Sequence, residues 1–229
     1  DDILGSIAKA ITAGDAESAR ANLTQLQSLD PKTNEIPKLS EDLERLEEQI
    51  AFNNALQAMD QLTANDNWAD ALKLASKYRQ QFNNYQQFQQ RAEFVARIHR
   101  LIINASGILD APDQLIRPAA QKTAATLVAD SNMALSYSPT LATIIAKLEE
   151  TLASYTTPLD IIVVSDTHTF VEVKSVGQVG AVAQKTIQLL PGDYVFVGKR
   201  KGYVTIQVPV ELRPGDAEIK ILVIANEQI

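Results

Sequence analysis

Apolar residues in roughly the first two thirds of the chain recur at every third or fourth position, which is the spacing of one helix face. Ile3 and Ile7 begin the pattern, and Leu43 and Leu46 continue it after Ser40, a residue type that favours the start of a helix. The pattern is interrupted by residue types that end helices or form turns, at Gly14-Asp15, Asp30-Pro31, Asn65-Asp66-Asn67, Gly107 and Pro112. The sequence therefore predicts a series of helices over residues 1–156.

Aromatic residues continue the helical spacing in the middle of this region. Tyr78, Phe82, Tyr85 and Phe88 follow one another at steps of four, three and three, which predicts a helix through the Gln- and Asn-rich segment 80–90. A shared aromatic face of this kind is either part of the core or the wall of a groove that binds a partner. On the second interpretation, the candidate binding residues are Trp68, Tyr78, Phe82 and Tyr85.

From residue 159 onward the apolar positions alternate with polar ones or form short continuous runs, which is typical of β-strands. Strands are predicted at 160–165, 169–175, 185–190, 193–198, 203–212 and 218–224, with turns rich in Pro and Gly between them. The sequence therefore predicts an α+β fold, with an all-α region at 1–156 and a small antiparallel β-sandwich at 159–229.

A set of residues in the β part is predicted to build turns. Pro191 fixes its own φ, and Gly192 beside it is expected to adopt a positive φ, as is Gly202 in a later turn. Tyrosines that flank these turns can bury a ring and leave the hydroxyl in water. The predicted turn residues are Gly177, Gly180, Pro191, Gly192, Tyr194, Gly202 and Tyr203.

The basic cluster Lys199-Arg200-Lys201 lies in one of these turns. One interpretation is a charged turn that keeps the sheet edge soluble. The other is contact with an anionic partner, such as an acidic protein surface, a lipid headgroup or a cell-wall polymer.

Composition excludes several classes of function. The formal net charge of −7 argues against nucleic-acid binding, which requires clustered Lys and Arg. The chain has no Cys, which excludes disulfides, thiolate nucleophiles and Cys-based zinc sites. No apolar run approaches the ~20 residues that span a bilayer.

Catalytic and cofactor motifs are not recognised in the sequence. Its two histidines, His99 and His168, have no paired His at a metal-ligand spacing. Ser165 and Asp166 lie beside His168, but triad members usually converge from separate segments. We therefore predict a protein that is not an enzyme and that binds neither a metal nor a cofactor.

The helical region resembles tetratricopeptide repeats. Gly14-Asp15 followed by Ala19-Arg20 and Leu29-Asp30-Pro31 resembles the second half of such a repeat, and the run from Asn67 to Leu72 resembles a first half. The two segments lie about 53 residues apart rather than the 34 of a regular array, so the resemblance is to helix pairs.

The β region resembles the PEGA-like C-terminal domains of bacterial, mostly proteobacterial, envelope proteins. The resemblance rests on residues 163–169, 171–173, 176–180, 190–194, 197–200 and 202–203. It implies a non-catalytic module outside the cytoplasm, periplasmic or extracytoplasmic, in a protein whose membrane anchor precedes Asp1. The function expected is a scaffold or adaptor that binds a protein partner in the envelope; the alternatives are a cell-wall or glycan-binding module and, more distantly, an unrecognised hydrolase.

Overall fold

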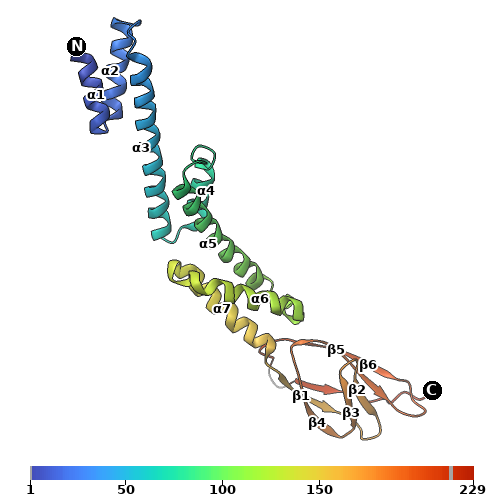
Figure 1. The fold of residues 1–229 in the computed structure, drawn as a ribbon. Coiled ribbons are helices and arrows are strands. Elements are labelled where there is room, and N and C mark those ends of the chain that lie inside the picture. The colour runs from blue at the N-terminus through green and yellow to red at the C-terminus, as the bar shows by residue number, and fades with distance from the viewer. Residues whose placement is uncertain (1, 217–218) are drawn as a thin grey trace. The chain divides into compact units, whose positions relative to one another are not determined.

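The computed structural model describes residues 2–216 and 219–229 and confirms the α+β class, with helices up to Thr156 and strands from Leu159 (Figure 1). The chain forms two compact units, one ending at Arg100 and one beginning at Leu101. This boundary falls within a helix and not at the change from helix to strand. The predicted division at 156–159 stays a prediction.

The first unit is helical throughout and has two successive cores along one long helix. Its elements are α1 (Asp2–Ala13), α2 (Ala16–Leu29), α3 (Ile36–Ala64), α4 (Trp68–Tyr78) and the part of α5 (Gln86–Asp110) up to Arg100. Ile7, Leu23 and Leu43 belong to a core formed by α1, α2 and the first half of α3. Phe52 and Met59, from the second half of α3, belong to a core shared with α4 and α5.

Two predictions about helix bounds in this unit are wrong. The long helix begins at Ile36 rather than after Ser40, because Pro37 is tolerated in a first helical turn. Residues 79–84 form a turn and not a helix. Tyr78, Phe82, Tyr85 and Phe88 are therefore not one helix face, although their side chains still meet.

The second unit starts with helical segments and ends with the strands. Its helical elements are the rest of α5, η1 (Pro112–Ile116), α6 (Pro118–Ser131), η2 (Asn132–Tyr137) and α7 (Pro139–Thr156). Ser138 precedes α7, and its Oγ accepts a hydrogen bond from the Leu141 amide at 3.0 Å. This bond satisfies one of the amides left free in the first turn, as expected for Ser before a Pro-initiated helix.

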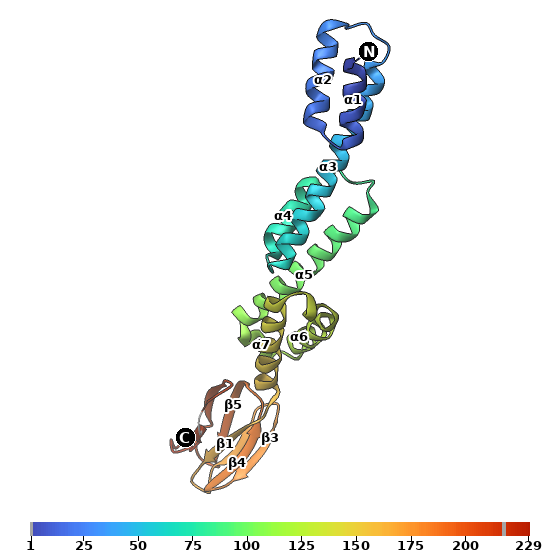
Figure 2. The same cartoon turned by 90° about the vertical axis from the view of Figure 1, so that its left-hand side faces the viewer.

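The described residues form seven strands in two sheets (Figure 2). One sheet has the order β4-β1-β7 and the other the order β3-β2-β5-β6. The strands are β1 (Leu159–Val164), β2 (Phe170–Val173), β3 (Gly177–Ala181), β4 (Gln184–Leu189), β5 (Gly192–Lys199), β6 (Ile206–Leu212) and β7 (Ile219–Leu222). Ile161, Val171, Phe196 and Val223 are among the buried residues between them.

The predicted β architecture needs three corrections. A seventh strand, β3, lies where only turn glycines were expected. The sandwich is mixed rather than antiparallel, because β7 pairs with β1 in parallel. Three strands, β2, β6 and β7, are shorter than predicted, and Glu218, the predicted first residue of the last, lies outside the described residues.

Polar contacts link the β part to the helical segments of the second unit. Tyr155 on α7 donates its hydroxyl to Asp113 Oδ1 at 2.8 Å, and Arg213 Nε lies 3.8 Å from the same oxygen. Arg213 also donates to Asp193 Oδ1 at 2.9 Å. One arginine therefore connects η1 with β5 inside this unit.

The predicted turn glycines differ in their backbone conformation. Gly202 has a φ of +81° and Gly180 a φ of +102°, both in the left-handed region. Gly192 does not adopt the positive φ predicted for it, since it begins β5 and pairs with Leu212. The nearby turn is instead held by Tyr194, whose hydroxyl donates to Leu190 O at 3.0 Å.

Candidate functional site

The aromatic residues proposed as a binding surface are mainly core. Trp68 is 3% exposed, and its Nε1 donates to Asp66 Oδ1 at 2.6 Å. Phe82 is fully buried, while Tyr78 and Tyr85 are half-buried against the same aromatic cluster. The binding interpretation is therefore wrong for Trp68 and Phe82, because a partner has no access to their rings.

The basic turn is tied to neighbouring strands and loops. Lys199 Nζ lies 2.5 Å from Glu172 Oε1, and Arg200 donates to Asp166 Oδ2 at 3.1 Å. The Arg200 guanidinium also stacks on Tyr203, 4.0 Å from the ring centroid. Only Lys201 has neither an ion pair nor a hydrogen bond from its side chain to a described residue. These contacts favour the interpretation of a structural turn.

Asp166 anchors the loop between β1 and β2. Its Oδ1 accepts hydrogen bonds from the amides of His168 at 3.1 Å and Thr169 at 2.7 Å. Burial raises the pKa of Asp166, but Thr169, His168 and the Arg200 charge outweigh it and lower the pKa from 3.8 to about 2. Ser165 donates instead to Val223 O at 2.7 Å, so the Ser165, Asp166 and His168 side chains do not form a triad.

The lowered pKa predicts an acid-dependent contribution of Asp166 to stability. A carboxylate whose pKa is depressed on folding stabilises the fold above its unfolded pKa and loses that effect as pH falls through the folded value. We expect Asp166→Asn to reduce stability at neutral pH, and the difference from wild type to shrink between about pH 4 and pH 2. Urea titrations at several pH values measure this.

Asp130→Asn is the matched control for this experiment. Asp130 is exposed on α6, and its side chain has no hydrogen bond or ion pair with a described residue. Its substitution should leave the pH dependence of stability unchanged. If Asp166→Asn reduces stability by the same amount at pH 7 and at pH 2, the charge of the Asp166 carboxylate does not have the proposed role.

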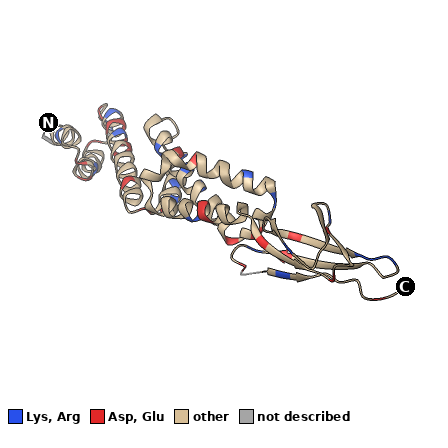
Figure 3. Cartoon of the chain, turned by 90° about the horizontal axis from the view of Figure 1, so that it is seen from below, with Lys and Arg blue, Asp and Glu red and all other residues tan. Residues whose placement is uncertain are grey.

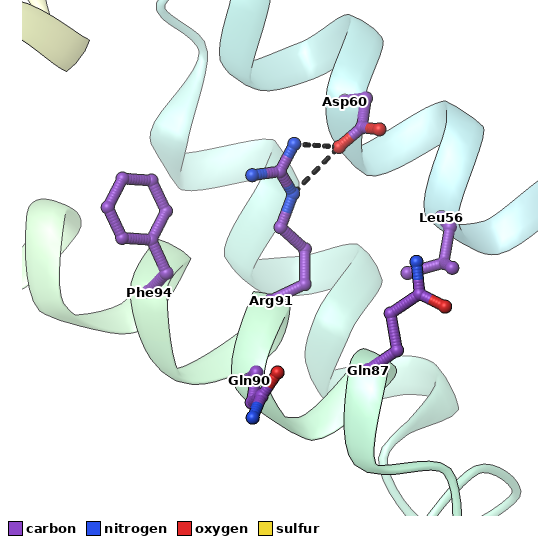
Figure 4. A pocket seen from close by; sticks show the side chains of 6 residues that line it. All are labelled: Leu56, Asp60, Gln87, Gln90, Arg91 and Phe94. Carbon is purple, nitrogen blue, oxygen red and sulfur yellow. Dashed lines mark hydrogen bonds and ion pairs between the residues drawn. The ribbon is translucent and has the colours of Figure 1, made fainter.

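One hollow of the first unit lies between α3 and α5 and has a volume of about 310 Å³. Figure 4 shows Arg91 reaching across it to Asp60, with Phe94 beside it. The Arg91 guanidinium donates to Asp60 Oδ1 through two nitrogens, at 2.7 Å from Nε. The charges of this hollow are paired within the protein, which leaves little to recognise a charged ligand.

A second hollow of about 340 Å³, which we call the arginine groove, lies between α4 and α5. Its apolar lining comes mainly from alanine, and three arginines stand at its rim. None of the three arginines forms an ion pair or side-chain hydrogen bond with a described residue. The lining residues are Leu72, Ala75, Ser76, Arg79, Gln89, Ala92, Glu93, Ala96, Arg97 and Arg100.

The arginine groove was not predicted from the sequence, although part of its signal was present. Arg97 and Arg100 are spaced by three positions, which places both on one side of a helix. Arg79 follows α4 and joins them only through the packing of that helix against α5. That packing cannot be inferred from the spacing of residues along the chain.

Other classes of site are not formed by the described residues. Nowhere in 2–216 and 219–229 do three His, Asp or Glu side chains converge in a way that could hold a metal ion. Among the helices described, none is long and apolar enough to cross a membrane. No family model matches the sequence, and no curated protein matches it significantly.

Proposed function

We propose that this protein is a non-catalytic scaffold or adaptor of the bacterial envelope, and that its helical unit binds a segment of a protein partner. The observation that carries the proposal is the arginine groove, where exposed charged side chains surround an apolar floor. Binding sites commonly combine an apolar lining with a few polar groups that orient the ligand. The envelope location rests on the resemblance of residues 159–225 to PEGA-like domains.

Charge is otherwise mixed across the molecule. Lys and Arg as well as Asp and Glu occur on helices and strands alike (Figure 3). The basic turn at 199–201 is already engaged by Glu172 and Asp166. For these reasons we place the partner on the helical unit and give the turn a secondary role.

Photo-crosslinking from the groove tests the proposed function. A photoreactive amino acid at Ser76, on the exposed rim, should give a discrete protein adduct in intact bacterial cells. The same amino acid at Gln25, exposed on α2 and outside the groove, should give none. Equal adducts from both positions would contradict the proposal. So would a protein that sediments with purified peptidoglycan equally well with and without a bulky residue at Ser76, and this result would favour a cell-wall binder.

A further inference from the structure

The arginines of the groove differ from most arginines in the chain. Ion pairs with carboxylates engage Arg20, Arg45, Arg91, Arg200 and Arg213. The four arginines without an ion pair to a described residue are Arg79, Arg97, Arg100 and Arg117, and three of these line the groove. Three arginines without an ion pair to a described residue therefore lie close together at this groove, in a chain with a net charge of −7.

The lining combines this charge with a small apolar floor. Ala75 is buried, and Leu72, Ala92 and Ala96 are half-buried. Glu93 is the one acidic residue of the lining, so positive charge remains in excess. The volume of about 340 Å³ is suited to a few side chains rather than to a whole domain.

We propose that the arginine groove recognises an acidic segment of the partner, with carboxylates at the rim and a small aliphatic side chain on the alanine floor. A guanidinium binds a carboxylate through two parallel hydrogen bonds, which gives geometric specificity as well as attraction. Arg97 and Arg100 lie about one helical turn apart on α5, so the matching carboxylates are spaced similarly along the segment. This inference rests on the proposed function and specifies the chemistry of its ligand.

Fluorescence anisotropy with the full chain tests the charge requirement. The probe is a fluorescein-labelled peptide in which Glu and Ala repeat at helical spacing, and its control has Gln in place of every Glu. We expect only the Glu peptide to bind. The double variant Arg97→Glu, Arg100→Glu should weaken binding about tenfold or more, since each charge-assisted hydrogen bond contributes at least that factor. Arg117→Glu reverses one arginine charge outside the groove and should leave binding intact.

A second pair of variants tests whether the Glu peptide occupies the groove. Ser76→Trp obstructs the groove without changing its charge, and Gln25→Trp is its control on α2. The inference is supported if both Ser76→Trp and the double arginine variant lose binding of the Glu peptide. Circular dichroism of each variant confirms that the helices are retained.

Three results would overturn the acidic-segment inference. One is equal binding of the Glu and Gln peptides. Another is binding of single-stranded DNA as tight as that of the Glu peptide, since this would show general attraction to anions. The third is an envelope adduct at position 76 that survives in the double arginine variant; the groove would then still bind a partner, and only the acidic ligand would be wrong.

Discussion

Replacing Phe82 by Ala is expected to lower the free energy of unfolding of the first unit by about 3–5 kcal/mol. Phe82 is fully buried, and its ring centroid lies 5.6 Å from that of Phe52 and 5.2 Å from that of Phe88. Tyr78 stacks on it at 5.6 Å, so the substitution removes a ring contacted from several sides. Chemical denaturation followed by the fluorescence of Trp68, which is buried in the same unit, measures the effect.

Leu29→Ala is the control for the Phe82 experiment. Leu29 ends α2 and is 66% exposed, so its truncation should change stability by less than about 0.5 kcal/mol. If the free energy of unfolding of Phe82→Ala lies within about 1 kcal/mol of wild type, the aromatic cluster is not a core that the first unit requires. A chain of two units need not unfold in one step. Trp68 lies in the first unit, so its fluorescence is used to follow the unfolding of that unit.

The Phe82 cluster also shows where the helical prediction failed. Steps of four, three and three are as regular as a helix requires, but periodicity registers only the apolar positions. The turn at 79–84 is closed by Tyr85 N, which donates to Phe82 O at 3.2 Å, and by Gln89 Nε2, which donates to the same oxygen at 3.1 Å. These local bonds replace helix hydrogen bonds and bring the rings together around Phe82.

The change of periodicity and the cap at Asp15 were more reliable guides, whereas the start predicted from Ser40 was wrong. Asp15, at the first predicted interruption of the helical pattern, caps α2, and its side chain accepts a hydrogen bond from the Ser18 amide at 3.0 Å. The change from helix to strand falls between Thr156 and Leu159, where the apolar spacing changes. Each of these features depends on a few consecutive residues, so a short stretch of sequence is enough to predict it.

Features that depend on distant segments were not predictable. The strand β3 carries Gly177 and Gly180, which have a low strand propensity, and it forms through pairing with β2. The Asp60–Arg91 contact joins residues 31 positions apart. The arginine groove could not be predicted for the same reason. Its arginines come together only where α4 packs against α5, and no local sequence pattern predicts that packing.

The other large effect is expected at Gly198 in β5, the glycine where an added Cβ would meet the closest neighbouring atoms. A Cβ at this position would lie 2.8 Å from Ile206 Cγ2 and 2.9 Å from Cγ2 of Thr169 and Cγ1 of Val223. We expect Gly198→Ala to lower the free energy of unfolding of the second unit by about 1–3 kcal/mol, as overpacking of a dense core does, and Gly198→Val to cost more. Thermal unfolding followed by circular dichroism, with backbone amide spectra of the β residues, measures both.

The three contacts at Gly198 come from different parts of the β-sandwich, so no single shift relieves them. Ile206 starts β6, Thr169 precedes β2, and Val223 follows β7 in the other sheet. Thr169 is additionally fixed, since its Oγ1 accepts a hydrogen bond from the Ala225 amide at 3.1 Å. Gly177→Ala in β3 is the control: no atom lies within 4 Å of its added Cβ, and stability should be unchanged. If the alanine variants at 198 and 177 melt alike, the close approach of the two sheets at Gly198 does not limit stability.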